Sequence, residues 1–125
     1  MASETVDTRN SLKNRGICVI IPTYNNAGTI VDVVRRSLEQ CDDVIVVCDG
    51  CTDATLSLLE GMSPDPVSGK KADLVVLQKN SGKGAALRAG FRHALSRGFA
   101  YAITLDGDGQ HFPEDIPLML KANRE

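Results

Sequence analysis

The chain has 125 residues, of which 42% are hydrophobic and 24% charged, and its formal net charge is -2 at pH 7. This length allows one domain, and the composition is that of an ordinary folded protein rather than a disordered or fibrous one. The small net charge does not favour nucleic acid as a partner, because nucleic acids are usually held by a strongly basic surface.

The N-terminal segment is polar and mixed in charge. We interpret residues 1–16 as an extension and residues 17–125 as the start of a domain. No stretch has the hydrophobic centre of a signal peptide, and none approaches the ~20 apolar residues that span a bilayer. We therefore expect a cytoplasmic protein, or one at the cytoplasmic face of a membrane if the full-length protein carries a membrane segment elsewhere.

Short apolar runs alternate with amphipathic stretches, which is the rhythm of a parallel α/β sheet flanked by helices. The predicted strands are Ile17–Pro22, Val44–Cys48, Leu74–Leu77 and Tyr101–Leu105. The predicted helices are Thr29–Glu39, Thr52–Met62, Lys83–Arg97 and one that begins near Pro113. The periodicity of the third helix predicts a core-facing stripe of Leu87, Phe91, Ala94 and Leu95. The chain stops four strands into the sheet, so we expect a truncated domain.

Two of the four cysteines, Cys18 and Cys48, fall in apolar strand patterns, where a reduced thiol behaves as a small hydrophobe. Cys48 and Cys51 have the spacing of a redox or zinc pair. However, a second ligand pair is missing, and a redox pair normally opens a helix. We therefore favour a structural role for this pair.

Ligands of an open parallel sheet bind beyond the carboxyl ends of the strands, where the strand order reverses. A polar, turn-forming segment follows each predicted strand: Thr23–Asn26, Asp49–Asp53, Asn80–Gly84 and Asp106–His111. Their convergence on one edge of the sheet predicts the functional site.

The last of these segments is the most informative. Asp106 and Asp108 are separated by one glycine directly after a strand, so both carboxylates can face a hard divalent cation. Mg²⁺ and Mn²⁺ prefer oxygen ligands and complete their shell with substrate phosphates and water. Gln110 adds an amide oxygen and His111 an imidazole. Although Asp and Gly are common in solvated turns, this position favours a metal site.

The other segments offer contacts for a nucleotide. Gly82 and Lys83 lead into a helix whose N-terminal amides can face an anion, with tight helix packing as the alternative. Asp49 can accept hydrogen bonds from a nucleobase or a ribose. Tyr24 either stacks on a base or packs at the strand end.

In order along the chain, these motifs resemble those of glycosyltransferase family 2, and particularly its polyprenyl-phosphate and dolichol-phosphate types. The matching pieces are Ile20-Ile21-Pro22-Thr23-Tyr24-Asn25, Asp49-Gly50-Cys51-Thr52-Asp53-Ala54-Thr55, Asn80-Ser81-Gly82-Lys83-Gly84-Ala85-Ala86 and Asp106-Gly107-Asp108-Gly109-Gln110-His111. The resemblance covers about Ile17 to Leu120.

The resemblance implies a Rossmann-like GT-A fold, a nucleotide-diphosphate sugar donor, and a divalent metal, Mg²⁺ or Mn²⁺, that neutralises the leaving diphosphate. It implies an acceptor such as a polyprenyl phosphate or a growing glycan. With the loop residues above, the candidate donor-binding residues are Pro22, Tyr24, Asn25, Asp49, Gly82, Lys83 and Asp106. The candidate metal ligands are Asp108, Asp106 and Gln110.

Three positions depart from the family pattern. Cys48 replaces an acidic or amide residue before Asp49, Cys51 replaces a motif serine, and Asn26 replaces a glutamate of many lipid-phosphate members. Family members also continue into a part that supplies the acceptor site and the catalytic base, so we expect this chain alone to bind donor without transferring sugar. The alternatives are a non-catalytic nucleotide- or partner-binding module and a nucleotidyltransferase-like domain. The latter is disfavoured because Thr23–Thr29 contains no lysine or arginine.

Overall fold

A computed structural model gives the fold and describes residues 2–110 and 112–117. Four parallel strands form one sheet with the spatial order β3-β2-β1-β4. Their bounds are β1 Ile17–Thr23, β2 Val44–Asp49, β3 Asp73–Leu77 and β4 Tyr101–Thr104. The predicted Rossmann-like parallel sheet is therefore confirmed.

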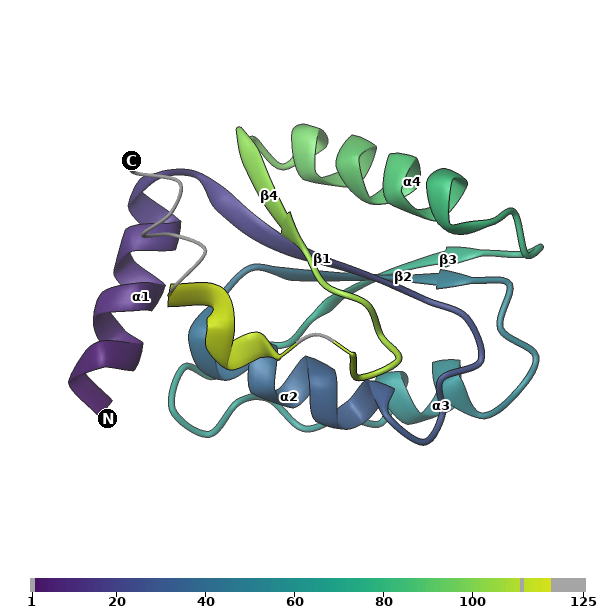
Figure 1. Ribbon diagram of the computed structural model, residues 1–125, viewed down its shortest axis with the longest axis horizontal. Helices are drawn as coiled ribbons and strands as arrows, with labels where there is room; N and C mark the ends of the chain where they lie inside the picture. The colour runs from purple at the N-terminus through teal and green to yellow at the C-terminus, as the bar shows by residue number, and fades with distance from the viewer. Residues whose placement is uncertain (1, 111, 118–125) are drawn as a thin grey trace.

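Helices cover both faces of this sheet (Figure 1). Helix α4 (Lys83–Ser96) packs on one face of the sheet. The opposite side carries the other helical elements, which are α1 (Ala2–Asn14), α2 (Ile30–Gln40), α3 (Thr55–Glu60) and the 3-10 turn η1 (Pro113–Asp115). Because side chains alternate along a strand, Val19 and Ile21 of β1 join the core of the α2 face, whereas Ile20 joins that of the α4 face. The single strand β1 thus supplies side chains to the hydrophobic cores on both faces of the sheet.

Strand β1 continues through Pro22, where the sequence pattern predicts its end. Pro22 pairs with Val47 of β2 on one side, but β4 pairs with β1 only as far as Ile20. The N–H that proline lacks is therefore not needed for a ladder bond to β4. The carbonyl of Pro22 instead accepts a hydrogen bond from the Gly107 N–H at 3.3 Å.

Helix α4 faces the sheet with its small residues, which are Ala86, Gly90 and Ala94. The predicted stripe is wrong at Phe91 and Leu95, whose exposed fractions are 42% and 70%. A Cβ at Gly90 would lie 2.6 Å from Ile20 Cγ2, so the helix approaches the sheet too closely for large side chains on this face.

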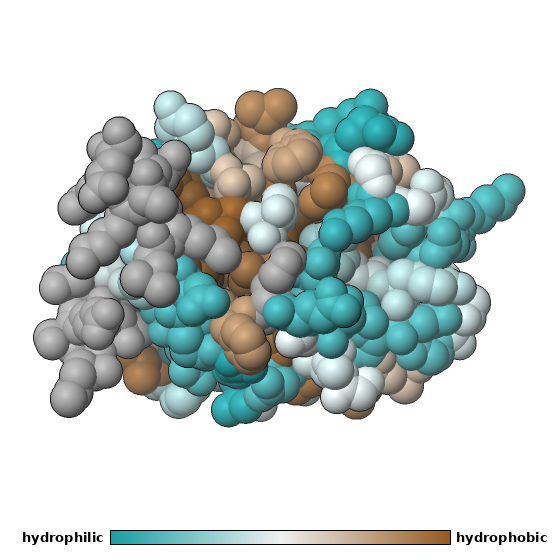
Figure 2. Space-filling view, viewed as in Figure 1, coloured by the Kyte–Doolittle hydropathy of each residue, from teal (hydrophilic) through white to brown (hydrophobic). Residues whose placement is uncertain are grey.

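Exposed hydrophobic side chains gather over β4 and the carboxyl-terminal half of α4, whereas the end of the molecule at which the strands finish is mainly hydrophilic (Figure 2). The exposed hydrophobic residues of this region are Phe91, Leu95 and Tyr101. Among residues 2–110 and 112–117, no helix is long and apolar enough to span a bilayer.

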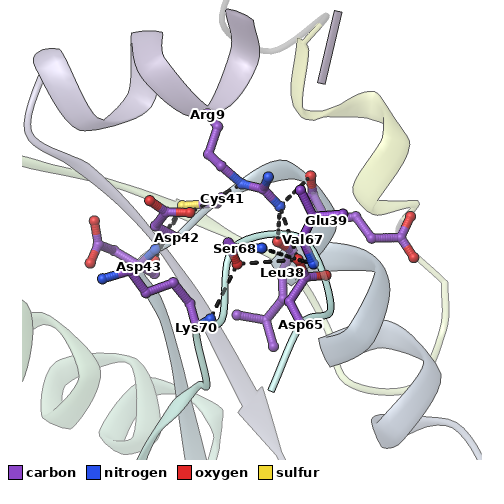
Figure 3. A network of polar contacts seen from close by, with 10 residues as sticks. All are labelled: Arg9, Leu38, Glu39, Cys41, Asp42, Asp43, Asp65, Val67, Ser68 and Lys70. Atoms are coloured by element: carbon purple, nitrogen blue, oxygen red, sulfur yellow. Dashed lines mark hydrogen bonds and ion pairs between the residues drawn. The ribbon is translucent and has the colours of Figure 1, made fainter. Parts of the chain in front are cut away.

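The N-terminal extension folds as α1, an element that the sequence pattern does not predict. Arg9 fastens it to the domain (Figure 3). The Arg9 Nη2 donates to the carbonyls of Leu38 and Glu39 at 2.6 and 2.9 Å, at the end of α2, where a cation suits the helix dipole. The same guanidinium lies 3.1 Å from Asp42 Oδ1 and 3.6 Å from Asp65 Oδ2. A nearly buried cation thus joins α1 to two segments that are distant in sequence, residues 38–42 and the loop that contains Asp65.

Candidate functional site

A pocket of about 320 Å³ lies at the carboxyl ends of the strands. It opens beside β1 and β4, between which the strand order reverses, because β2 and β3 lie on the other side of β1. Its lining residues are Pro22, Thr23, Tyr24, Asn26, Asp49, Asn80, Gly82, Lys83, Ala86, Asp106, Gly107 and Asp108. The structure thus brings together every candidate residue except Asn25 and Gln110.

Asp106 and Lys83 meet across this pocket. The Lys83 Nζ lies 2.7 Å from Asp106 Oδ1, and the side chains are 62% and 23% exposed. An ion pair this open to solvent is held by at most about 1 kcal/mol. Lys83 is therefore able to leave Asp106 for a stronger anion, and the Asp106 carboxylate is able to accept another cation.

Asp108 is exposed and shapes its own turn, because its Oδ1 accepts the Gln110 N–H at 3.0 Å. This bond uses one carboxylate oxygen. Gln110 is itself exposed and does not line the pocket, while His111 lies outside the described residues. Within 2–110 and 112–117, no group of three or more His, Cys, Asp or Glu side chains is arranged to hold a metal ion.

Gly107 allows this acidic turn to lie against the loop that follows β1. A Cβ at this position would lie 2.8 Å from Thr23 Oγ1 and 3.0 Å from Ile30 Cδ1, so a larger residue would push the turn away. The Thr29 hydroxyl also donates to the Gly107 carbonyl at 2.8 Å. The two carboxylates are therefore anchored to the start of α2 as well as to β4.

Asp49 is buried, with 3% of its surface exposed, and it holds the loop that precedes α4. Its two carboxylate oxygens accept the N–H groups of Ser81 at 2.8 Å and Gly82 at 3.0 Å. The Gly82 N–H is therefore already used within the protein. Asp49 also lines the pocket, so it both supports the site and faces it.

The loop after β1 contributes one exposed ring and one bridging amide. Tyr24 lines the pocket and is 46% exposed, which leaves its ring accessible to a ligand. Asn25 adopts a positive φ of 50°, and its Oδ1 accepts the N–H groups of Thr52 at 2.8 Å and Asp53 at 3.2 Å. Its side chain thus joins the first two strand-end loops and lies outside the pocket lining.

Three polar side chains of the pocket lining, those of Thr23, Asn26 and Asn80, were not among the sequence candidates. All three belong to the polar segments that follow the strands, so their position in the sequence would have been enough to predict them as pocket residues. Asn26 also has a structural task, because its Oδ1 accepts hydrogen bonds from the Thr23 hydroxyl at 2.7 Å and the Tyr24 N–H at 3.2 Å. It thereby fixes the turn that presents Tyr24.

The family model described as Glycosyl transferase family 2 matches residues 18–125. The chain belongs to glycosyl transferase family 2. It is 31% identical over 112 residues to an undecaprenyl-phosphate 4-deoxy-4-formamido-L-arabinose transferase of Edwardsiella ictaluri, which covers 85% of this chain and 33% of the relative. It is 36% identical over 107 residues to a polyprenol monophosphomannose synthase of Mycolicibacterium smegmatis, with 83% and 39% covered.

These comparisons confirm the expected family. The chain spans about a third of the length of the first relatives it matches. The match begins at residue 18, so all of α1 precedes the matched segment. Arg9 therefore lies outside that segment, whereas the residues that it contacts lie within it.

Proposed function

We propose that this family 2 chain binds a nucleotide-diphosphate sugar in the strand-end pocket, through a divalent cation held by Asp106 and Asp108. The observation that carries the proposal is the pairing of Lys83 with Asp106 in a pocket that Asp108 also lines. A cationic and an anionic group side by side suit a ligand that consists of a diphosphate and its counter-ion.

The side chains present fit Mg²⁺ or Mn²⁺. Such ions take one or two protein carboxylates and complete their octahedral shell with water and substrate phosphates, so a cluster of three acidic residues is not required. Asp106 and Asp108 would supply the carboxylates, with the Gln110 amide as a further oxygen donor. When bound, the cation would stabilise the negative charge of the leaving nucleoside diphosphate.

The other residues divide the work of holding the donor. Lys83 would exchange its contact with Asp106 for a phosphate oxygen, and the half-exposed Tyr24 ring would provide a flat surface for the base. Asp49, through Ser81 and Gly82, keeps the start of α4 and therefore Lys83 in place. Pro22 forms part of the pocket wall behind the donor.

For the whole protein, we propose sugar transfer to a polyprenyl phosphate. The names of the two relatives include undecaprenyl phosphate and polyprenol monophosphomannose, and this supports a lipid-linked acceptor. A lipid-linked acceptor would bring the full-length protein to a membrane face. The catalytic base is not assigned to any residue of this chain.

The proposal is tested by calorimetric titration of UDP, GDP and their sugar conjugates into the purified chain, with and without Mn²⁺. We expect binding of at least one of these nucleotides that depends on Mn²⁺ and that weakens at least about tenfold in Asp108→Ala, because a metal ligand is lost.

The matched control is Glu60→Ala, which removes an exposed carboxylate of α3 outside the pocket. This variant should bind like wild type. A folded wild-type chain that binds none of these nucleotides, or that binds them equally well without metal and in Asp108→Ala, would overturn the proposal.

A further inference from the structure

Two thiols flank the Asp49–Gly50 turn at the end of β2. The Cys51 thiol lies against the Cys48 sulfur, with the two Sγ atoms 3.6 Å apart. A disulfide bond is about 2.04 Å long, so the sulfurs are already neighbours and need to approach by only about 1.6 Å. Sequence spacing suggested this pair, and the structure gives it the proximity that oxidation requires.

The four cysteines, all in the described part of the chain, differ in access. Cys18, Cys41 and Cys48 are buried, whereas Cys51 is partly exposed. Burial raises the pKa of Cys18 to about 11 and that of Cys41 to about 12. Burial, and then the contact with Cys51, raises the pKa of Cys48 to about 12. Cys51 is therefore the thiol that a dissolved oxidant reaches first.

We propose that Cys48 and Cys51 form a reversible disulfide that loosens the nucleotide-binding loops, so that oxidation weakens donor binding. The part that concerns donor binding rests on the function proposed above. The oxidant is a low-molecular-weight disulfide such as oxidised glutathione.

The chemistry is two successive exchanges. Cys51 loses its proton and attacks one glutathione sulfur, which forms a mixed disulfide and releases the first glutathione. Cys48 then loses its proton and attacks the Cys51 sulfur, which breaks the mixed disulfide and releases the second glutathione. The two protons end on the two released glutathione thiols. The protein loses two electrons, which the glutathione disulfide gains.

The turn between the sulfurs has little room to absorb the movement. Gly50 has a φ of 66°, and a Cβ on it would lie 2.2 Å from the Asn80 nitrogen, so its backbone is pressed against the loop before α4. Asp49, the residue before it, holds the Ser81 and Gly82 N–H groups of the same loop. Drawing Cys51 toward Cys48 therefore strains the hydrogen bonds that position the start of α4.

The movement also reaches the loop after β1. The Cys51 sulfur lies 3.7 Å from the Thr23 carbonyl, and the next residues, Thr52 and Asp53, hold the Asn25 side chain. Asn25 adjoins Tyr24, the exposed ring of the pocket. One covalent bond at this turn is thus coupled to two of the loops that line the pocket.

The covalent step is tested by exposing the native chain to oxidised glutathione, alkylating the remaining thiols after unfolding, and mapping peptides by mass spectrometry. We expect a Cys48–Cys51 link, with Cys18 and Cys41 still alkylated. Stable glutathione on Cys51 without the link, or no oxidation of this pair, would overturn the proposal.

The effect on the loop is read by amide hydrogen exchange of Ser81 and Gly82. Their exchange should become about fivefold faster in the oxidised chain, as expected for one weakened hydrogen bond each. Unchanged exchange in a chain that carries the mapped disulfide would contradict the proposed coupling. This readout needs no ligand.

Donor binding is then titrated with UDP and GDP in the presence of Mn²⁺. The oxidised chain should bind about fivefold more weakly than the reduced one, and the reductant dithiothreitol should restore binding. In Cys51→Ser the oxidant should have no effect, whereas Cys41→Ala, or Cys18→Ala if the former does not fold, should respond like wild type. Equal binding by both redox forms would refute the regulatory role.

Absence of binding by the reduced chain would instead contradict the proposed function. In that case peptide mapping and amide exchange would still decide whether the disulfide forms and whether it loosens the loop.

Discussion

The two ends of the sheet each carry a contact between oppositely charged side chains, and the contacts differ in their access to water. At the amino end, Arg9 is 11% exposed and its partners Asp42 and Asp65 are 15% and 4% exposed. At the carboxyl end, Lys83 is 62% exposed. Buried charges must keep their partners because no water replaces them, while exposed charges exchange partners readily. The same chemistry therefore builds a scaffold at one end and, in our proposal, a binding site at the other.

The strongest test of this contrast is Arg9→Ala. It leaves two nearly buried carboxylates and two helix-end carbonyls without their cation, so we expect a loss of about 3 kcal/mol in the free energy of unfolding. Urea denaturation measures it. Lys83→Ala should cost less than about 1 kcal/mol in the same assay. Equal losses in the two variants would remove the distinction between the two ends.

A smaller effect is expected from Lys83→Met, which keeps the length of the side chain and removes its charge. Without nucleotide, Mn²⁺ should bind up to about fivefold more tightly, because Asp106 is freed from a competing cation. With a nucleoside diphosphate present, nucleotide binding should weaken, because a phosphate contact is lost. Calorimetry separates the two effects, and Lys71→Met, at an exposed lysine outside the pocket, is the control. A change of the same sign in both titrations would argue against an exchange of partners.

The smallest effect is expected from Asp65→Asn, because asparagine keeps an oxygen that can accept the hydrogen bonds of Ser68 and Val67. Burial alone raises the pKa of the Asp65 carboxyl, but the hydrogen bonds from Ser68 and Val67, aided by Arg9, hold its pKa below the ordinary 3.8. A carboxyl with a depressed pKa stabilises the fold above pH 3.8, and this contribution is lost as the pH falls through its value in the folded protein.

The stability difference between wild type and Asp65→Asn should therefore shrink on acidification from about pH 7 to about pH 3. Denaturation at each pH measures it. A difference that stays constant or widens would mean that the Asp65 charge takes no part in the scaffold.

The positions of the strands and of the polar segments after them could be predicted from the sequence, because both are local properties. Continuous apolar runs mark β1 and β2, which are buried along their whole length, and turn residues follow each strand. The face of α4 that meets the sheet could not be predicted, because it depends on how closely the helix approaches Ile20. Hydrophobicity alone favours Phe91 and Leu95 on that face. Helix α1 was missed because its segment is mostly polar, and because it is attached through Arg9 and the buried Leu12, whose partners are distant in sequence.

Within the site, the identity of the lining residues was more predictable than their tasks. Asp106 and Asp108 could be predicted because they are two carboxylates, one residue apart, that directly follow a strand. Asn25, in contrast, is predicted from its motif to bind the donor, but its side-chain oxygen accepts the N–H groups of Thr52 and Asp53. Helix α3 likewise begins at Thr55 rather than Thr52, after Asp53 accepts the Thr55 N–H at 2.9 Å. Both outcomes arise from contacts between loops, which a linear pattern does not contain.

The pairing of β4 with β1 has a consequence for the order in which the protein assembles. Ile17 lies opposite Tyr101, so this edge of the sheet closes a loop that includes β2, β3 and most of the helices. Parallel pairings across such sequence distances form slowly, because chain entropy must be lost before the contacts are gained. We therefore expect the loops after β1 and β2 to be in place before β4 docks. The carboxylates of Asp106 and Asp108 would then arrive last, and any affinity for a metal-bound nucleotide would appear only with the final folding step.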